Sequence, residues 1–208
     1  MATAQAGKMK VIDYGVASHA LAGPDESGDL HVVEFTEDRI LLAAIDGIGH
    51  GQSAASAAML ASEILRSSPL ASPELLMQRC HDALRFTRGV VMSLAVIFPL
   101  AHQMVWLGVG NVLAALRRGD SPVGMLQETL LLRGGVVGAQ LPALQTSTLS
   151  LRRGDILFLA TDGIESDFVF DSAPFAAPQT CADNILKNYS RGTDDALVLV
   201  ARYLGGLS

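Results

Sequence analysis

The chain has 208 residues, of which 50% are hydrophobic and 17% are charged, and its formal net charge is −6. This composition argues against a disordered chain, and the acidic balance argues against a protein that binds nucleic acid or an anionic membrane. The two cysteines are far apart, no apolar segment is long enough to span a bilayer and no signal-peptide pattern is present, so we expect a cytoplasmic protein without disulfides.

The first half of the chain alternates between strand and helix patterns. Loose alternation predicts a strand within residues 9–21, and a second strand is expected over 30–35. The uncharged apolar run 40–45 predicts a third strand, buried on both faces, that pairs with the second as a hairpin. Small apolar residues at three- and four-residue spacing over 51–67 predict a helix with one buried face. A serine-proline-glutamate cap then opens a second helix over 73–85.

The second half of the chain is rich in strands. We expect strands at 90–98, 104–109, 112–116, 156–160 and 196–203, and a helix at 180–188. Two further strands, 125–132 and 146–151, are expected to pair with each other around a loop that contains glycines. Because no internal repeat or linker divides the chain, we expect one α+β domain over residues 1–208, with sheet packed on sheet and helices outside.

Four aspartates occur at the predicted strand ends. Asp46 and Asp162 follow buried apolar strands and precede glycine, whereas Asp29 and Asp194 precede apolar strands. In an antiparallel sheet the end of one strand lies beside the start of its neighbour, so all four carboxylates can line one edge. An Asp-Gly pair by itself is a common turn. Two such pairs after buried strands, the first followed by further alternate glycines, favour a site.

A cluster of carboxylates at one edge needs a counter-charge. Ionised carboxylates repel one another in a partly desolvated site, unless they are protonated or a cation neutralises them. No lysine or arginine occurs in residues 11–38, and none follows Asp46 until Arg66. Metal is therefore the expected counter-charge, and oxygen ligands select Mg²⁺ or Mn²⁺. Two such ions could activate a water molecule and bind a phosphoryl oxygen.

At these residues the sequence resembles the PPM family of metal-dependent serine/threonine phosphatases. The matching segments occur in the family's order and are Gly28-Asp29, Asp46-Gly47-Ile48-Gly49-His50-Gly51, Thr161-Asp162-Gly163-Ile164 and Asp194-Asp195. Within the family the chain is most similar to the small bacterial, SpoIIE-like branch. Thr87-Arg88-Gly89 and Val109-Gly110-Asn111 resemble in particular the stressosome phosphatases of the RsbX type.

The resemblance implies an αββα four-layer sandwich of two mainly antiparallel sheets flanked by helices, with a centre of two Mn²⁺ or Mg²⁺ ions. It implies that Asp46 bridges both ions and that the Gly47 carbonyl binds the second. Asp162 and Asp194 would hold the first ion, and Asp29 would hold the second directly or through water. The implied enzyme is a protein-serine/threonine phosphatase that uses a metal-activated water and forms no phosphoenzyme, and Asp46→Asn should abolish its activity.

The resemblance also implies the substrates. They would be phosphoserine or phosphothreonine on the scaffold and antagonist proteins of the stressosome, which are RsbR- and RsbS-like STAS proteins, and their dephosphorylation would reset a general stress response. Neither nucleic acid nor a membrane is an expected partner. One alternative is an inactive binding module with the same fold. Another is a histidine-kinase-like ATP-binding protein, but its pattern needs glycine at the positions of Ile48 and His50.

This chain departs from larger family members at two points. It has no arginine upstream of the first acidic motif, so the metals or another group must bind phosphate, and Leu197 replaces a threonine that supports Asp194. Arg88 could reach the phosphoprotein, although a surface cation is favoured. His50 could protonate the leaving oxygen, although a solvent-facing loop residue is favoured. For Asp195, a role behind the metal ligands and a solvated turn are equally supported.

Overall fold

Two antiparallel sheets form the centre of the molecule in the computed structural model, which describes residues 11–21, 27–119, 127–168 and 176–205. The first sheet has the strand order β1 (Ile12–His19), β10 (Ala196–Tyr203), β9 (Ile156–Ala160), β6 (Leu113–Arg117) and β7 (Gln127–Thr129). The second has the order β2 (Asp29–Phe35), β3 (Ile40–Gly47), β4 (Val90–Phe98), β5 (Gln103–Val109) and β8 (Ser147–Ser150).

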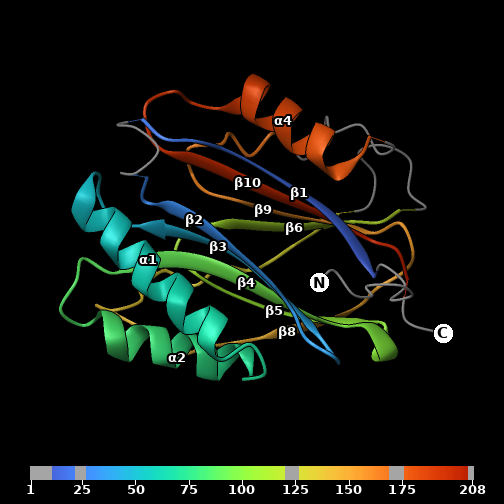
Figure 1. Ribbon diagram of the computed structural model, residues 1–208, viewed down its shortest axis with the longest axis horizontal. Helices are drawn as coiled ribbons and strands as arrows, with labels where there is room; N and C mark the ends of the chain where they lie inside the picture. Colours follow the sequence, from blue (N-terminus) through green and yellow to red (C-terminus); the bar gives the residue numbers. More distant parts are fainter. Residues whose placement is uncertain (1–10, 22–26, 120–126, 169–175, 206–208) are drawn as a thin grey trace, which may run out of the picture.

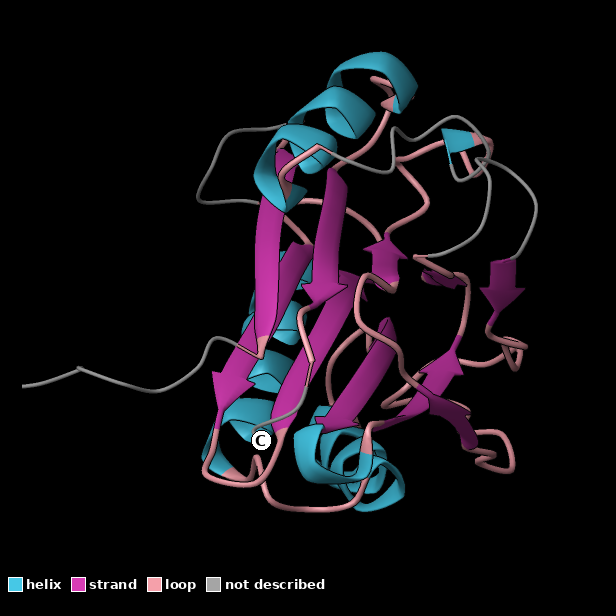
Figure 2. Cartoon of the chain, turned by 90° about the vertical axis from the view of Figure 1, so that its right-hand side faces the viewer, coloured by secondary structure: helices cyan, strands magenta, loops and turns pink. Residues whose placement is uncertain are grey.

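Helices cover the outer faces of both sheets (Figure 1). Helices α1 (Gln52–Ser67) and α2 (Pro73–Leu84) pack on the second sheet, and α4 (Pro178–Tyr189) packs on the first. Figure 2 shows the same layers from the side, with helices above and below the strands. This is the αββα sandwich that the sequence predicted. None of the helices in the described ranges is long and apolar enough to cross a membrane.

Three apolar layers hold the sandwich together. The central layer lies between the sheets and includes Leu42 from β3 and Leu199 from β10. A second layer joins the other face of β3 to α1 and α2, where the alanines of α1 allow close packing, and a third joins the first sheet to α4. The residues of β3 from Ile40 to Ile45 are all buried, because they face an apolar layer on either side. That burial explains why the sequence there is a continuous apolar run.

One predicted strand pairing is wrong. Residues 125 and 126 lie outside the described ranges, and the described parts of the segments predicted at 125–132 and 146–151 do not pair with each other. In the described residues, β7 pairs with β6 in the first sheet, and β8 pairs with β5 in the second. Each short strand extends an existing sheet edge, and the chain between them crosses from one sheet to the other. A strand pattern identifies a strand but not its partner, which is set by the tertiary packing.

Candidate active site

The aspartates meet at one end of the sandwich, although not at the edge of one sheet as the sequence predicted. Asp29 lies directly opposite Asp46 in the β2–β3 pair of the second sheet. Asp162 follows β9 and Asp194 precedes β10, and these strands pair in the first sheet. Two carboxylates therefore come from each sheet. The sequence could not show this, because strand order along the chain does not assign strands to sheets.

A pocket of about 310 Å³ opens at this end of the sandwich. Its lining residues are Leu21, Asp46, Ile48, Gly49, His50, Val91, Asn111, Asp162, Thr193 and Asp194. Three of the predicted metal ligands thus share the pocket. The other two, Asp29 and Gly47, are buried and are not among the lining residues. Asp29 is 5% exposed and is paired with Asp46 on the neighbouring strand.

Burial and mutual repulsion disfavour the ionised forms of Asp46 and Asp29. Desolvation, with repulsion from Asp29, Asp162, Asp194 and Asp195, raises the pKa of Asp46 to about 8. Desolvation and the other aspartates raise the pKa of Asp29 to about 7, against a hydrogen bond that lowers it. No lysine or arginine is among the described residues that line the pocket. A cation would relieve this repulsion.

The donor set fits a hard divalent ion. The carboxylates of the pocket, with Asp29 behind them, offer only oxygen, the ligand atom that Mg²⁺ and Mn²⁺ prefer. No three histidine, cysteine, aspartate or glutamate side chains of the described ranges are grouped as a ready-made metal site. The assignment of Asp29, Asp46, Gly47, Asp162 and Asp194 as ligands stays a prediction, and it is supported by the electrostatics of the cluster.

Neutral donors orient two of the aspartates. The Thr161 hydroxyl donates to Oδ2 of Asp29 over 2.6 Å and accepts from the Leu197 backbone N–H over 2.9 Å. Nδ2 of Asn111 donates to Oδ2 of Asp162 over 2.7 Å. Neither Thr161 nor Asn111 has a role that was predicted from the sequence. The available signal was their place inside segments that resemble the family, Thr161 directly before Asp162 and Asn111 after a glycine turn.

Asp195 supports the site from behind. It is 9% exposed, and its carboxylate accepts the backbone N–H of Leu21 over 2.8 Å and of Gly28 over 2.7 Å. These bonds tie the loop before Asp29 to the loop before β10. Of the two alternatives left by the sequence, this burial and these bonds exclude the solvated turn, and the role behind the metal ligands stays a prediction.

The glycine segment after β3 fits closely between neighbouring elements. A Cβ atom at Gly47 would lie 2.3 Å from the carbonyl oxygen of Ala54, so only glycine allows α1 to pack this closely. The Gly47 N–H donates to the Gly28 carbonyl over 3.0 Å, and the Ile48 N–H donates to the Gly89 carbonyl over 3.1 Å. Gly49 has φ +95°, in the left-handed region that favours glycine.

Residues 36–204 match the family model of Stage II sporulation protein E (SpoIIE). The phosphoserine phosphatase RsbX of Bacillus subtilis (strain 168) is 24% identical over 186 residues, which cover 89% of this chain and 90% of RsbX. The crystal structure of RsbX in complex with magnesium has a TM-score of 0.83 at 20% identity, with 95% of this chain and 98% of that chain covered.

Two other solved structures share the fold. One, reported under "The bacterial stressosome: a modular system that has been adapted to control secondary messenger signaling", has a TM-score of 0.84 and 29% identity, and covers 93% of this chain and 100% of its own. The other is the catalytic domain of the serine/threonine phosphatase PstP in complex with two manganese ions, with a TM-score of 0.71, 17% identity, and 93% and 99% coverage. The predicted fold class is confirmed, and two of these structural relatives, RsbX and PstP, were solved with magnesium and with manganese.

Proposed function

The chain belongs to the SpoIIE family, and from this premise we propose that it is a metal-dependent phosphatase that removes phosphate from phosphoserine and phosphothreonine of stressosome proteins. Its class, a protein-serine/threonine phosphatase, was predicted from the sequence and is confirmed by the family match and by the phosphatase RsbX. The substrates, the number of ions and the residues that hold them are the proposal.

One observation carries the proposal: several carboxylates converge in a pocket whose described lining has no cationic side chain. Asp46, Asp162 and Asp194 would hold two divalent ions from the pocket, with Asp46 shared between them, and Asp29 and the Gly47 carbonyl would act from behind. When bound, such ions supply an activated water and positive charge for the phosphoryl oxygens. Protonation of Asp46 and Asp29, whose pKa values are raised, would compete with this binding.

The chain's own residues hold these carboxylates in place. Thr161 and Asn111 each donate one hydrogen bond to an aspartate, which fixes its orientation without neutralising its charge. Asp162 and Asp194 are exposed at the pocket, so a phosphoserine on the surface of a folded protein can approach them. His50 is also exposed in the lining and would meet the substrate side chain. These features favour a phosphoprotein over a small buried substrate.

The choice of stressosome substrates rests on the relatives. RsbX is a phosphoserine phosphatase, and a solved structure with 29% identity concerns the bacterial stressosome. We infer that the substrates are RsbR-like scaffold and RsbS-like STAS antagonist proteins, and that their dephosphorylation resets a general stress response in the cytoplasm. We further propose that residues 1–208 act as a single phosphatase domain.

The test is release of inorganic phosphate from purified stressosome scaffold and antagonist proteins phosphorylated on serine or threonine. We expect release with Mn²⁺ or Mg²⁺, none with excess chelator, and slower release from an unrelated phosphoprotein. Equal rates on the unrelated protein would contradict the stressosome assignment. No release from any phosphoprotein with either ion would favour the inactive binding module of the same fold.

A further inference from the structure

Among the described residues that line the pocket there is no lysine or arginine to receive phosphate. A phosphate monoester carries up to two negative charges, and the described lining of the pocket presents carboxylates, a histidine, an asparagine and apolar groups. Arginine suits phosphate because its planar guanidinium offers paired N–H donors. Two arginines of the described residues contact residues that line the pocket, Arg88 beside Gly49 and Arg191 beside Asp162.

Arg191 is already engaged with the backbone of the site. Its Nε donates to the carbonyl oxygen of Asp162 over 2.9 Å, and its backbone N–H donates to the carbonyl of Gly163 over 2.9 Å. Both bonds hold the turn that carries Asp162. Loss of Arg191 would therefore disturb the position of that aspartate, so its role is to support the turn.

Arg88 lies against the glycine segment. A Cβ atom at Gly49 would be only 2.5 Å from Nη1 of Arg88, so the guanidinium occupies the space that any side chain at position 49 would take. Gly49 itself lines the pocket. Arg88 is exposed, and its guanidinium forms no hydrogen bond or ion pair with any residue that the structure describes.

The backbone around Arg88 is fixed. Gly47 lies opposite Val90 at the start of the β3–β4 pair, and the Ile48 N–H donates to the carbonyl of Gly89 over 3.1 Å. The Thr87 hydroxyl in turn accepts the Gly89 N–H over 3.0 Å. The base of the Arg88 side chain is thus tied to the segment that carries Asp46, while its charged end is left without a protein partner among the described residues.

We propose that Arg88 binds the phosphate of the phosphoprotein substrate at the mouth of the pocket, as the protein's own cationic group for that purpose. This inference rests on the proposed phosphatase function and adds a substrate-binding residue to it. The glycine at position 49 leaves the guanidinium room beside the pocket. The sequence favoured a surface cation, since it could not show that residues 49 and 88 touch.

The experiment compares Arg88→Ala and Arg88→Lys with the control Arg85→Ala, which removes an exposed arginine at the end of α2 that has no contact with the glycine segment. The readouts are KM and kcat on a phosphoserine protein and on an aryl phosphate, inhibition by inorganic phosphate, and the Mn²⁺ concentration for half-maximal activity. For Arg88→Ala we expect about a tenfold rise in KM and an equal loss of phosphate inhibition, because a charged hydrogen-bond donor is lost.

In the same variant, kcat should change less than KM, and the Mn²⁺ dependence should match that of the wild type. Arg88→Lys should lie between Arg88→Ala and the wild type, since lysine keeps the charge but not the paired donors. If Arg88→Ala behaves like Arg85→Ala, or if it shifts the Mn²⁺ dependence and leaves phosphate inhibition intact, the assignment of Arg88 is wrong. An inactive wild type would instead overturn the proposed function.

Discussion

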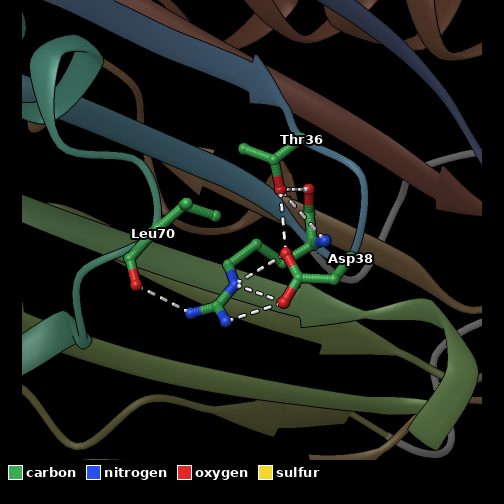
Figure 3. A network of polar contacts seen from close by, with 4 residues as sticks. Thr36, Asp38 and Leu70 are labelled. Carbon is green, nitrogen blue, oxygen red and sulfur yellow. Dashed lines mark hydrogen bonds and ion pairs between the residues drawn. The ribbon is translucent and has the colours of Figure 1, made fainter.

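The carboxyl groups at the two ends of the β2–β3 hairpin have opposite electrostatic surroundings. At the turn, Asp38 is bound by Arg39, whose Nη2 lies 2.8 Å from Oδ2 and whose Nε contacts both carboxylate oxygens (Figure 3). Hydrogen bonds from Arg39 lower the pKa of Asp38. At the other end, Asp29 and Asp46 lie opposite each other, and burial and repulsion raise their pKa values.

The aspartates on either side of strand β9 differ in the same way. Asp155, before its first residue, is 1% exposed and accepts a hydrogen bond from Nη1 of Arg118 over 2.8 Å and from the backbone N–H of Gly119 over 3.0 Å. Asp162, after its last residue, accepts from the neutral Asn111. Asp38 and Asp155, away from the site, are each paired with an arginine. At the site end, the side-chain donors that the structure describes for Asp29 and Asp162 are neutral, which is expected where a bound cation provides the charge.

The largest expected difference between the two ends of the hairpin is in the rate of catalysis after an aspartate is replaced. Asp46→Asn keeps the shape of the side chain but removes the charge proposed to be shared by two ions. We expect phosphate release to fall at least about a thousandfold, since the ions supply several kcal/mol of charge stabilisation. Asp38→Asn, at the opposite end of the same hairpin, should leave the rate unchanged. Equal rates for Asp46→Asn and the wild type would remove Asp46 from the site.

The second effect is on folding. Asp155→Ala removes the acceptor of the Arg152 and Gly119 N–H groups and one of the two carboxylate partners of Arg118, which keeps Glu128. We expect the free energy of unfolding to fall by about 3 kcal/mol, because three hydrogen bonds to a buried carboxylate are lost. Denaturant unfolding measures this loss, and kcat per folded molecule should stay at the wild-type value. A loss of kcat without a loss of stability would show that Asp155, at the start of β9, contributes to catalysis and not only to folding.

The strands and aspartates of the site end were predicted from the sequence. The buried runs that became β3 and β9, each ending on Asp-Gly, were predicted because strands buried on both faces are continuously apolar. The cap of α2 was also predicted, and the Ser72 hydroxyl accepts the Leu75 N–H over 3.3 Å. Local patterns of this kind depend on neighbours in the chain, so one sequence is enough to find them.

The rest depended on contacts between distant segments. The pairing of β7 and β8 was wrong, because each strand joins a different sheet. The hydrogen bonds of Thr161 and Asn111 join residues 132 and 51 positions apart, and no local pattern encodes them. The contact of Arg88 with Gly49 is of the same kind. The identity of the acidic residues was thus predictable, but the groups that orient them were not.

The third effect is the pH dependence of stability without metal. Because the pKa values of Asp29 and Asp46 are raised to about 7 and about 8, the folded state binds these protons more tightly than the unfolded state does. Stability is therefore lost as the pH rises through those values. Burial lowers the pKa of His31, and this shift makes stability rise with pH. That rise levels off above about pH 6.5, the usual pKa of histidine.

Urea unfolding in excess chelator between about pH 6.5 and about pH 8.5 should therefore show a fall on the order of 2 kcal/mol. Saturating Mg²⁺ should remove the fall, because the ion binds the deprotonated carboxylates. Asp46→Asn should reduce the fall in chelator, whereas Asp38→Asn should not. A pH profile unaffected by Mg²⁺ would mean that these carboxylates do not bind it.

The smallest effect concerns the neutral donors that take the place of arginine at the site. The Thr161 hydroxyl donates to Asp29 and lowers its pKa against the effect of burial, and it also accepts the Leu197 N–H. Thr161→Val keeps the shape but removes the bond that favours ionised Asp29. Loss of a group that orients a metal ligand commonly lowers metal affinity tenfold or more. We therefore expect Thr161→Val to bind Mn²⁺ about tenfold more weakly than the wild type.

Thr161→Ser is the matched control, because it keeps the hydroxyl and should bind Mn²⁺ like the wild type. Calorimetric titration of Mn²⁺ separates this effect from a change in kcat, and denaturant unfolding measures the cost of leaving the Leu197 N–H without an acceptor. If Thr161→Val loses stability but keeps its Mn²⁺ affinity, the hydroxyl serves the fold, as Arg118 does at the other end of β9. If it loses affinity and Thr161→Ser does not, Asp29 contributes to metal binding from its buried position behind Asp46.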